Sequence, residues 1–143
     1  MAEATQATFN FELVSPERRL ISEPAKMVVI PGEEGDFGVL PGHSALVATI
    51  RPGVVEVHSI ESGEVRRIFI AGGFADVTPQ SCTILAEEAI NVLDLNAEAL
   101  EKALGNLKED LALSKDDIER ARVTKKINLI QAKVAALSGK IAA

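Results

Sequence analysis

The chain has 143 residues, of which 47% are hydrophobic and 25% are charged. This length suits one compact domain, or a domain of about 95 residues with a helical extension, and such a high apolar content excludes a disordered protein. No apolar run is longer than four residues, which excludes a transmembrane helix. The first residues, Met1–Gln6, lack the basic and apolar segments of a signal or transit peptide, so we expect the protein to stay where it is made.

Few residues suited to metal or nucleic-acid chemistry are present. The single cysteine, Cys82, excludes an intrachain disulfide and a cysteine-based metal site. Two histidines, His43 and His58, are too few for a histidine-rich site. There is no Trp or Tyr and there are only five Phe, which argues against a platform for stacking single-stranded nucleic acid. We therefore expect no metal, no cofactor and no nucleic-acid partner.

The charge is distributed unevenly along the sequence. Residues 1–95 contain 6 basic and 14 acidic residues, a balance of −8, whereas residues 96–143 contain 9 basic and 7 acidic residues, a balance of +2. Residues 115–143 alone have a balance of +4. This asymmetry predicts two modules that meet different partners.

Residues 1–90 have the pattern of a sheet. Between residues 8 and 14 apolar and polar residues alternate, with Phe9, Phe11 and Leu13 on one face of a half-buried strand. Further segments rich in β-branched residues follow, separated by turn signals such as Pro-Gly at 31–32, 41–42 and 52–53. Short strands at this spacing indicate a β sandwich or barrel. The expected strands are Thr8–Val14, Lys26–Ile30, Ala45–Ile50, Val54–His58, Val65–Ala71 and Cys82–Ala86.

Residues 91–143 have helical periodicity and predict an antiparallel two-helix hairpin. Asn96 is expected to cap the first helix. The run from Ser114 to Asp117 has the spacing of a capping box, which predicts Ser114 as the cap of the second helix. Each helix has one apolar face that needs a partner. The two faces are Ala97, Leu100, Leu104, Leu107 and Leu111, and then Val123, Ile127, Ile130, Val134, Leu137 and Ile141.

No set of residues assembles a catalytic site. The segment 31–43 contains several glycines but lacks the ending of a phosphate-binding loop and carries three acids, so we interpret it as a long, glycine-bent connection that presents acids to a partner. His43 precedes Ser44, but a base and a nucleophile need facing side chains, and a bond from His43 to the local backbone is simpler. Cys82 lies in an apolar strand and is expected to be buried. These features predict a non-catalytic interaction subunit.

Four motifs occur in order and carry a family resemblance. The motifs are Glu34–His43, which ends in Pro-Gly-His, the Arg51-Pro-Gly53 turn, the Gly-Gly segment Gly72–Val77, and the strand Thr83–Glu87. With these motifs the sequence resembles the epsilon subunit of the bacterial rotary ATP synthase, and the resemblance covers nearly all of its length, including the two-helix tail.

The resemblance implies a stalk subunit of an ATP synthase that translocates protons. Its sandwich would lie between the gamma subunit and the membrane c-ring, with Glu34, Asp36 and His43 near these partners. Its helical tail would fold back, or extend towards the catalytic alpha and beta subunits and hinder ATP hydrolysis. Lys125, Lys126 and Lys133 would then approach an acidic surface. The membrane would be met only through the complex, at the cytoplasmic face of the bacterial plasma membrane.

One departure concerns nucleotide. Some family members bind ATP through an Ile/Leu-Asp-x-x-Arg-Ala motif at the start of the first helix. Here Leu93 stands at the acid position and Asn96 at the arginine position. Glu87 and Ala97 still match, but the charged contacts to nucleotide are missing, so we expect no bound ATP.

Two other hypotheses remain open from the residues alone. The protein could be an independent soluble β-sandwich binding module, with residues 31–43 as the mouth of a small-ligand site. It could also be an enzyme that uses the acids at 33–36 together with His43. Co-purification with the gamma subunit separates the stalk hypothesis from both.

Overall fold

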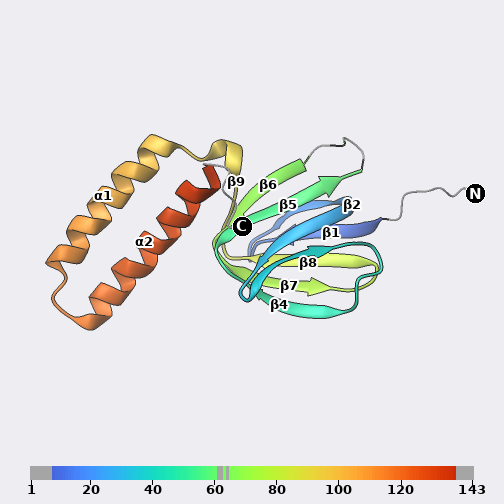
Figure 1. The fold of residues 1–143 in the computed structure, drawn as a ribbon, viewed down its shortest axis with the longest axis horizontal. Helices are drawn as coiled ribbons and strands as arrows, with labels where there is room; N and C mark the ends of the chain where they lie inside the picture. The colour runs from blue at the N-terminus through green and yellow to red at the C-terminus, as the bar shows by residue number, and fades with distance from the viewer. Residues whose placement is uncertain (1–7, 61–62, 64, 138–143) are drawn as a thin grey trace, which may run out of the picture. The chain divides into compact units, whose positions relative to one another are not determined.

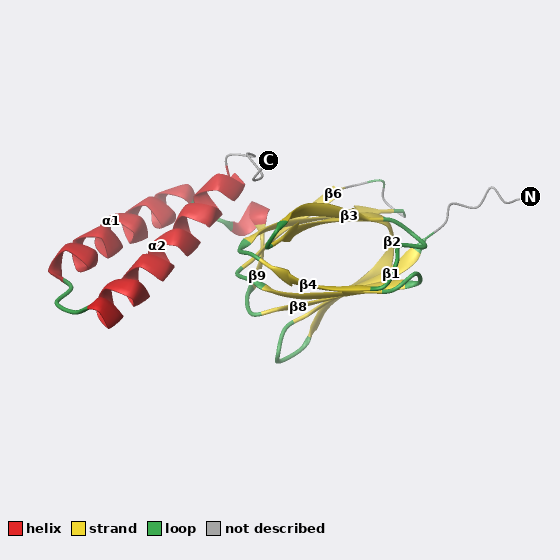
Figure 2. Ribbon diagram, turned by 60° about the horizontal axis from the view of Figure 1, so that its bottom comes forward, coloured by secondary structure: helices red, strands yellow, loops and turns green. Residues whose placement is uncertain are grey.

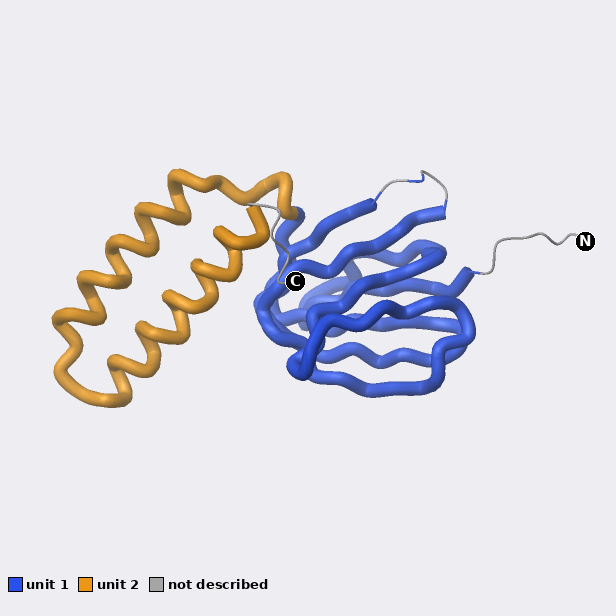
Figure 3. Tube along the Cα trace, in the orientation of Figure 1, with its two compact units in different colours: residues 1–91 blue, residues 92–143 orange. Residues whose placement is uncertain are grey.

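The computed structural model describes residues 8–60, 63 and 65–137. The protein divides into two compact units, residues 1–91 and residues 92–143 (Figure 3). The first unit contains strands and the second contains helices, so the predicted fold class is confirmed.

Within the described residues, nine strands of the first unit form two packed layers (Figures 1 and 2). The sheet is continuous and folds over, so that β1-β8-β7-β4 lie in one layer, β3, β5, β6 and β9 lie in the other, and β2 joins the two. The strands are β1 (Phe9–Val14), β2 (Arg19–Gly32), β3 (Gly35–Val39), β4 (Leu46–Ile50), β5 (Gly53–Ser59), β6 (Val65–Ile70), β7 (Gly73–Val77), β8 (Ser81–Ala86) and β9 (Ala89–Asn91).

Strand β2 belongs to both layers because it is long and irregular. Its first half pairs with β1, from Arg19 to Ala25, and its second half pairs with β3, from Val28 to Gly32. Its pairing with β5 shifts register between Ala25 and Met27, where the strand can bend. The strand predicted at Lys26–Ile30 is therefore too short, because Pro24, which resembles a strand breaker, continues the ladder opposite Asn10.

The core lies between the layers and consists of the side chains that point inward at alternate positions along the strands. Phe9, Phe11 and Leu13 of β1 are all buried, as their alternation predicts. Burial of each such residue stabilises the fold by roughly 1.5–3 kcal/mol relative to an exposed one. Their main neighbours in the core are Val28, Ile30, Val39, Val55, Val57, Ile70, Ala75, Val77, Cys82 and Ile84.

The interpretation of residues 31–43 as a bent connection is wrong for most of its length. Pro31 and Gly32 end β2, and Gly35–Val39 form β3, so this segment is a hairpin with Glu33 and Glu34 in its turn. Between residues 32 and 38, three glycines and three acids obscure the alternation of apolar and polar residues that is typical of a strand. The sequence also did not predict strands β7 and β9. Strand β7 begins at a Gly-Gly pair, which is a turn signal.

The second unit contains a short 3-10 turn, η2 (Val92–Asp94), and two antiparallel helices, α1 (Ala97–Leu113) and α2 (Asp117–Leu137). The helices pack side by side (Figure 1). Asn96 caps α1 as predicted, because its Oδ1 accepts a hydrogen bond from the Ala99 N–H at 3.0 Å. From the two predicted faces, Leu100, Val123 and Ile127 are buried. Ile141 lies outside the described residues.

Ser114 has a different role from the one predicted. It ends α1, where its hydroxyl donates to the Asp110 carbonyl oxygen at 2.9 Å and its N–H donates to Leu111. The cap of α2 is Asp116, whose Oδ1 accepts from the Glu119 N–H at 2.7 Å. Both side chains have cap chemistry, so spacing alone could not decide between them.

The close approach of β7 and β8 at Gly73 provides a test of the fold. An added Cβ at Gly73 would lie 1.9 Å from the Leu85 carbonyl oxygen. We expect Gly73→Ala to reduce the free energy of unfolding by about 3 kcal/mol or more, measured by urea denaturation. The control is Gly38→Ala in β3, where an added Cβ meets nothing within 4 Å. Equal urea midpoints for the two variants would contradict this packing.

Candidate functional site

The turn between β2 and β3 forms an exposed acidic hairpin. Glu33 and Glu34 occupy the turn and are both exposed. The Glu33 N–H donates to the Thr49 carbonyl oxygen at 2.9 Å, which ties the turn to β4. Neither carboxylate forms an ion pair within the described part of the structure. The hairpin therefore presents two negatively charged side chains to solvent on a turn whose backbone is held in place.

Arg51 holds this hairpin from the turn between β4 and β5. Its Nη2 lies 2.5 Å from Asp36 Oδ1, and its Nη1 donates to the Gly32 carbonyl oxygen. The side chains of Arg51 and Asp36 are only 29% and 27% exposed. The carboxylate of Asp36 is therefore paired within the protein, whereas Glu34 is exposed and has no ion-pair partner among the described residues.

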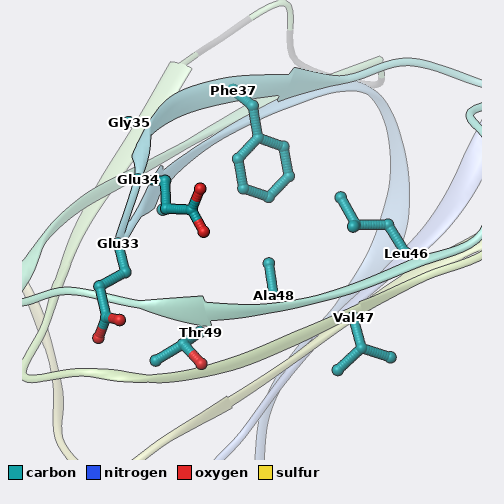
Figure 4. A pocket seen from close by; sticks show the side chains of 9 residues that line it. Glu33, Glu34, Gly35, Phe37, Leu46, Val47, Ala48 and Thr49 are labelled. Carbon is teal, nitrogen blue, oxygen red and sulfur yellow. The ribbon is translucent and has the colours of Figure 1, made fainter.

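A hollow of about 390 Å³, lined by both polar and apolar groups, lies between the acidic hairpin and β4. Phe37 of β3 and Leu46 and Ala48 of β4 point toward one another across it, with Glu34 at its rim (Figure 4). The hollow exists because β3 and β4 are not paired along their length, and β2 meets β4 only where Gly32 pairs with Ile50. Such a site suits an apolar side chain that is flanked by a positive charge.

His43 does not join the acids of the hairpin. It lies in the turn after β3, a strand of five residues that spans about 16 Å, so Glu34 and Asp36 lie at the opposite end of that strand. As expected, His43 bonds to local backbone: its Nδ1–H donates to the Ser44 carbonyl oxygen at 2.7 Å. The geometry thus gives no support to an enzyme that combines the acids at 33–36 with His43.

The outer face of the layer β4-β7-β8 carries large exposed apolar side chains, which sequence reasoning missed. Val47, Phe74 and Leu85 are 72%, 57% and 50% exposed. Phe74 pairs with Leu85, and Val47 lies diagonally across from Phe74, so the three are neighbours on one surface. We call these three residues the apolar face. The sequence carried no signal for it, because Phe74 and Leu85 have glycine or apolar neighbours on both sides, which do not show which face is outward.

Cys82 offers no reactive thiol. It is buried in β8, and burial, with a smaller effect of the Asp76 charge, raises the pKa of its thiol from 9.0 to about 12. The thiol is therefore neutral at physiological pH and a poor nucleophile. No cluster of three or more potential His, Cys, Asp or Glu ligands gathers among the residues that the structure describes.

The remaining predicted residues lie in separate parts of the protein. Lys125 and Lys126 are exposed on α2, and Lys133 is half-buried on the same helix. Glu87 follows β8 in the first unit, whereas Ala97 begins α1 in the second. No helix within the described ranges is long and apolar enough to cross a membrane.

Two family models match consecutive parts of the sequence. The model described as "ATP synthase, Delta/Epsilon chain, beta-sandwich domain" matches residues 8–92. The model for the C-terminal domain of the ATP synthase epsilon chain matches residues 96–143. The two matches coincide with the sheet and helical parts of the fold.

Similar proteins bear the name ATP synthase epsilon chain. The Rhodospirillum rubrum protein is 45% identical over 140 residues, which cover 97% of this chain and 100% of the relative. The Rhodospirillum centenum protein is 48% identical over 128 residues, covering 87% and 88%. A subunit in the cryo-EM structure of the Euglena gracilis mitochondrial ATP synthase, OSCP/F1/c-ring, is 30% identical with a TM-score of 0.81, covering 92% of this chain and 82% of that subunit.

The Arg51 contacts predict a measurable loss of stability. We expect Arg51→Ala to reduce the free energy of unfolding by about 1 kcal/mol, because it removes an ion pair and a hydrogen bond at a partly exposed position. Asp36→Ala removes only the ion pair and should have a smaller effect in the same urea titration. A larger loss for Asp36→Ala than for Arg51→Ala would show that Asp36 stabilises the hairpin in another way.

Proposed function

The chain belongs to the ATP synthase epsilon family, and we propose that it serves as a non-catalytic subunit of the central stalk. In this role it couples the gamma subunit to the c-ring of a proton-translocating synthase. The complex would lie at the cytoplasmic face of a bacterial plasma membrane, which this subunit meets only through its partners. We further propose that residues 1–90 bind these partners and that residues 91–143 form a regulatory hairpin.

The apolar face is the observation that carries the proposal. Val47, Phe74 and Leu85 project from neighbouring strands of a rigid sheet, and each is at least half exposed. Contiguous apolar side chains on a sheet surface mark a protein contact more often than chance exposure does. We assign this face to the gamma subunit, because a permanent subunit interface buries apolar surface.

The acidic hairpin supports a second contact, with the c-ring. Glu33 and Glu34 are exposed at the edge of the hollow, and Arg51 holds the backbone that carries them. A preorganised acidic surface favours a partner with basic side chains. His43, at the other end of β3, would meet a different part of the partners than Glu34 does.

The arrangement of the titratable groups supports the proposal that the subunit is non-catalytic. His43 is bonded to backbone, Asp36 is paired with Arg51, and Cys82 is buried as a neutral thiol. A nucleophile, a base and a group that orients the base therefore do not converge in the described structure.

The first test concerns gamma binding. We expect the double variant Phe74→Ser with Leu85→Ser to bind the gamma subunit at least about tenfold more weakly, equivalent to about 1.4 kcal/mol. Affinity can be measured by titrating the labelled full-length protein with gamma. The urea midpoint should fall only slightly, because each of the two side chains is at least half exposed.

Val65→Ser is the matched control, since Val65 is a 39% exposed apolar residue on β6, in the other layer. It should bind gamma as the unmodified protein does. If the unmodified protein does not bind gamma at all, the alternative of an independent binding module is favoured. If Val65→Ser weakens binding as much as the double variant, the apolar face is not the contact.

The second test concerns the helical tail, which we propose restrains ATP hydrolysis. Lys125 and Lys126 are exposed on α2 and would meet an acidic surface of the catalytic subunits. Deleting residues 115–143 should raise ATP hydrolysis by the assembled complex roughly fivefold, the low end of typical coupling energies. Synthesis and assembly should be retained.

Replacing Lys125, Lys126 and Lys133 by Ala should give a smaller increase in hydrolysis, and one that high salt reproduces. Lys102→Ala with Lys108→Ala on α1 is the charge control and should leave hydrolysis unchanged. Unchanged hydrolysis after both the deletion and the triple substitution would show that the tail is purely structural.

A further inference from the structure

The acidic hairpin turns on two glycines. Gly32 and Gly35 border Glu33 and Glu34, and Gly35 has a φ of 138°, a conformation that other residues rarely adopt. An added Cβ at Gly32 would lie 2.6 Å from the Gly35 carbonyl oxygen, so the turn needs glycine at both positions. Glycine loses more conformational freedom on ordering than any other residue. Contacts from outside the turn are therefore needed to hold the two carboxylates in place.

Arg51 contacts both strands of the hairpin. Its N–H donates to the Pro31 carbonyl oxygen at 3.0 Å, and its Nη1 donates to the Gly32 carbonyl oxygen, both on β2. Its Nη2 lies 2.5 Å from Asp36 Oδ1 on β3. A guanidinium can hold two acceptors at once because its donors form a rigid planar fork, which the point charge of a lysine does not provide.

The hairpin is also tied to strand β4. Arg51 directly follows Ile50, the last residue of that strand, and the Glu33 N–H donates to the Thr49 carbonyl oxygen at 2.9 Å. Strand β4 also carries Val47 of the apolar face. The acidic hairpin and the apolar face are therefore fastened to one strand, so each surface is held in place relative to the other.

The charge of Arg51 is matched within the hairpin. Its side chain is 29% exposed and is paired with Asp36. Glu33 and Glu34 are exposed and form no ion pair in the part of the chain that the structure describes. If Arg51 acted on a basic partner by charge alone, it would weaken the attraction of the hairpin. It therefore favours such a partner only through the geometry that it imposes on the two carboxylates.

We propose that Arg51 is the positioning residue of the c-ring contact. It fixes the acidic hairpin so that Glu33 and Glu34 meet basic side chains of the partner with little order left to gain on binding. The inference rests on the proposed contact between this hairpin and the c-ring. It gives Arg51 a role in affinity in addition to its role in stability.

Two affinities test this proposal, one for the gamma subunit and one for a complex of gamma with the c-ring. Labelled full-length protein is titrated with each, and the ratio of the two dissociation constants measures the gain in affinity that the c-ring contributes. We expect Arg51→Ala to reduce this gain roughly fivefold, with the affinity for gamma alone unchanged. Arg51→Lys should reduce it less. The salt dependence of the gain should not fall in Arg51→Ala, because both carboxylates remain.

The matched control is Arg67→Ala, which removes the same charge from an ion pair with Glu56, between β6 and β5. It should leave both affinities unchanged. Glu33→Gln with Glu34→Gln removes the carboxylates themselves and should abolish the gain together with its salt dependence. A urea titration of each variant checks that it is folded under the conditions of the binding measurement.

A larger gain in Arg51→Ala than in the unmodified protein would show that Arg51 acts by charge alone and would overturn the proposal. An unchanged gain in Arg51→Ala would also overturn it, as would an equal loss in Arg67→Ala. If the unmodified protein binds gamma but gains nothing from the c-ring, the proposed c-ring contact is wrong and the inference is wrong with it. A gain that Arg51→Ala retains contradicts the role of Arg51 alone.

Discussion

The pairing of strand β2 is the constraint on which the sheet unit depends. Its residues pair with β1, β3, β4 and β5, so one strand joins the two layers of the sandwich. A strand of 14 residues can do this only by bending, and the register shift after Ala25 provides the bend. Because the inward residues of β2 pack against both layers, the register of β2 also decides which residues of the other strands face outward.

The surfaces of the sheet unit follow from this arrangement. Strand β2 meets β4 only at Gly32, so β3 and β4 diverge and leave the hollow whose floor is apolar and whose rim is acidic. In the same layer as β4, the alternation of β7 and β8 turns Phe74 and Leu85 outward while Ala75 and Ile84 close the core. Arg51 then stiffens the acidic hairpin. Two chemically different surfaces therefore project from one rigid sandwich.

The helical unit depends on its caps more than on a large core. Two helices bury few residues between them, so caps at Asn96, Ser114 and Asp116 contribute much of the order at their ends. Acidic residues concentrate at 109–119, where α1 ends and α2 begins, whereas basic residues follow along α2. A pair of helices with so small a core can open locally at modest cost, which suits the regulatory role that we propose.

The sequence by itself determined the class of fold, the change from sheet to helix near residue 91, the inward face of β1 and the cap at Asn96, because each depends on local periodicity or local hydrogen bonding. It did not determine strand β3, since glycines and acids hide its alternation, nor the full length of β2, since Pro24 resembles a strand breaker. It also could not show that Asp36 is held by Arg51, 15 residues away. The apolar face was decided by tertiary structure alone, because a hydrophobic residue looks the same in the sequence whether its neighbours bury it or leave it exposed.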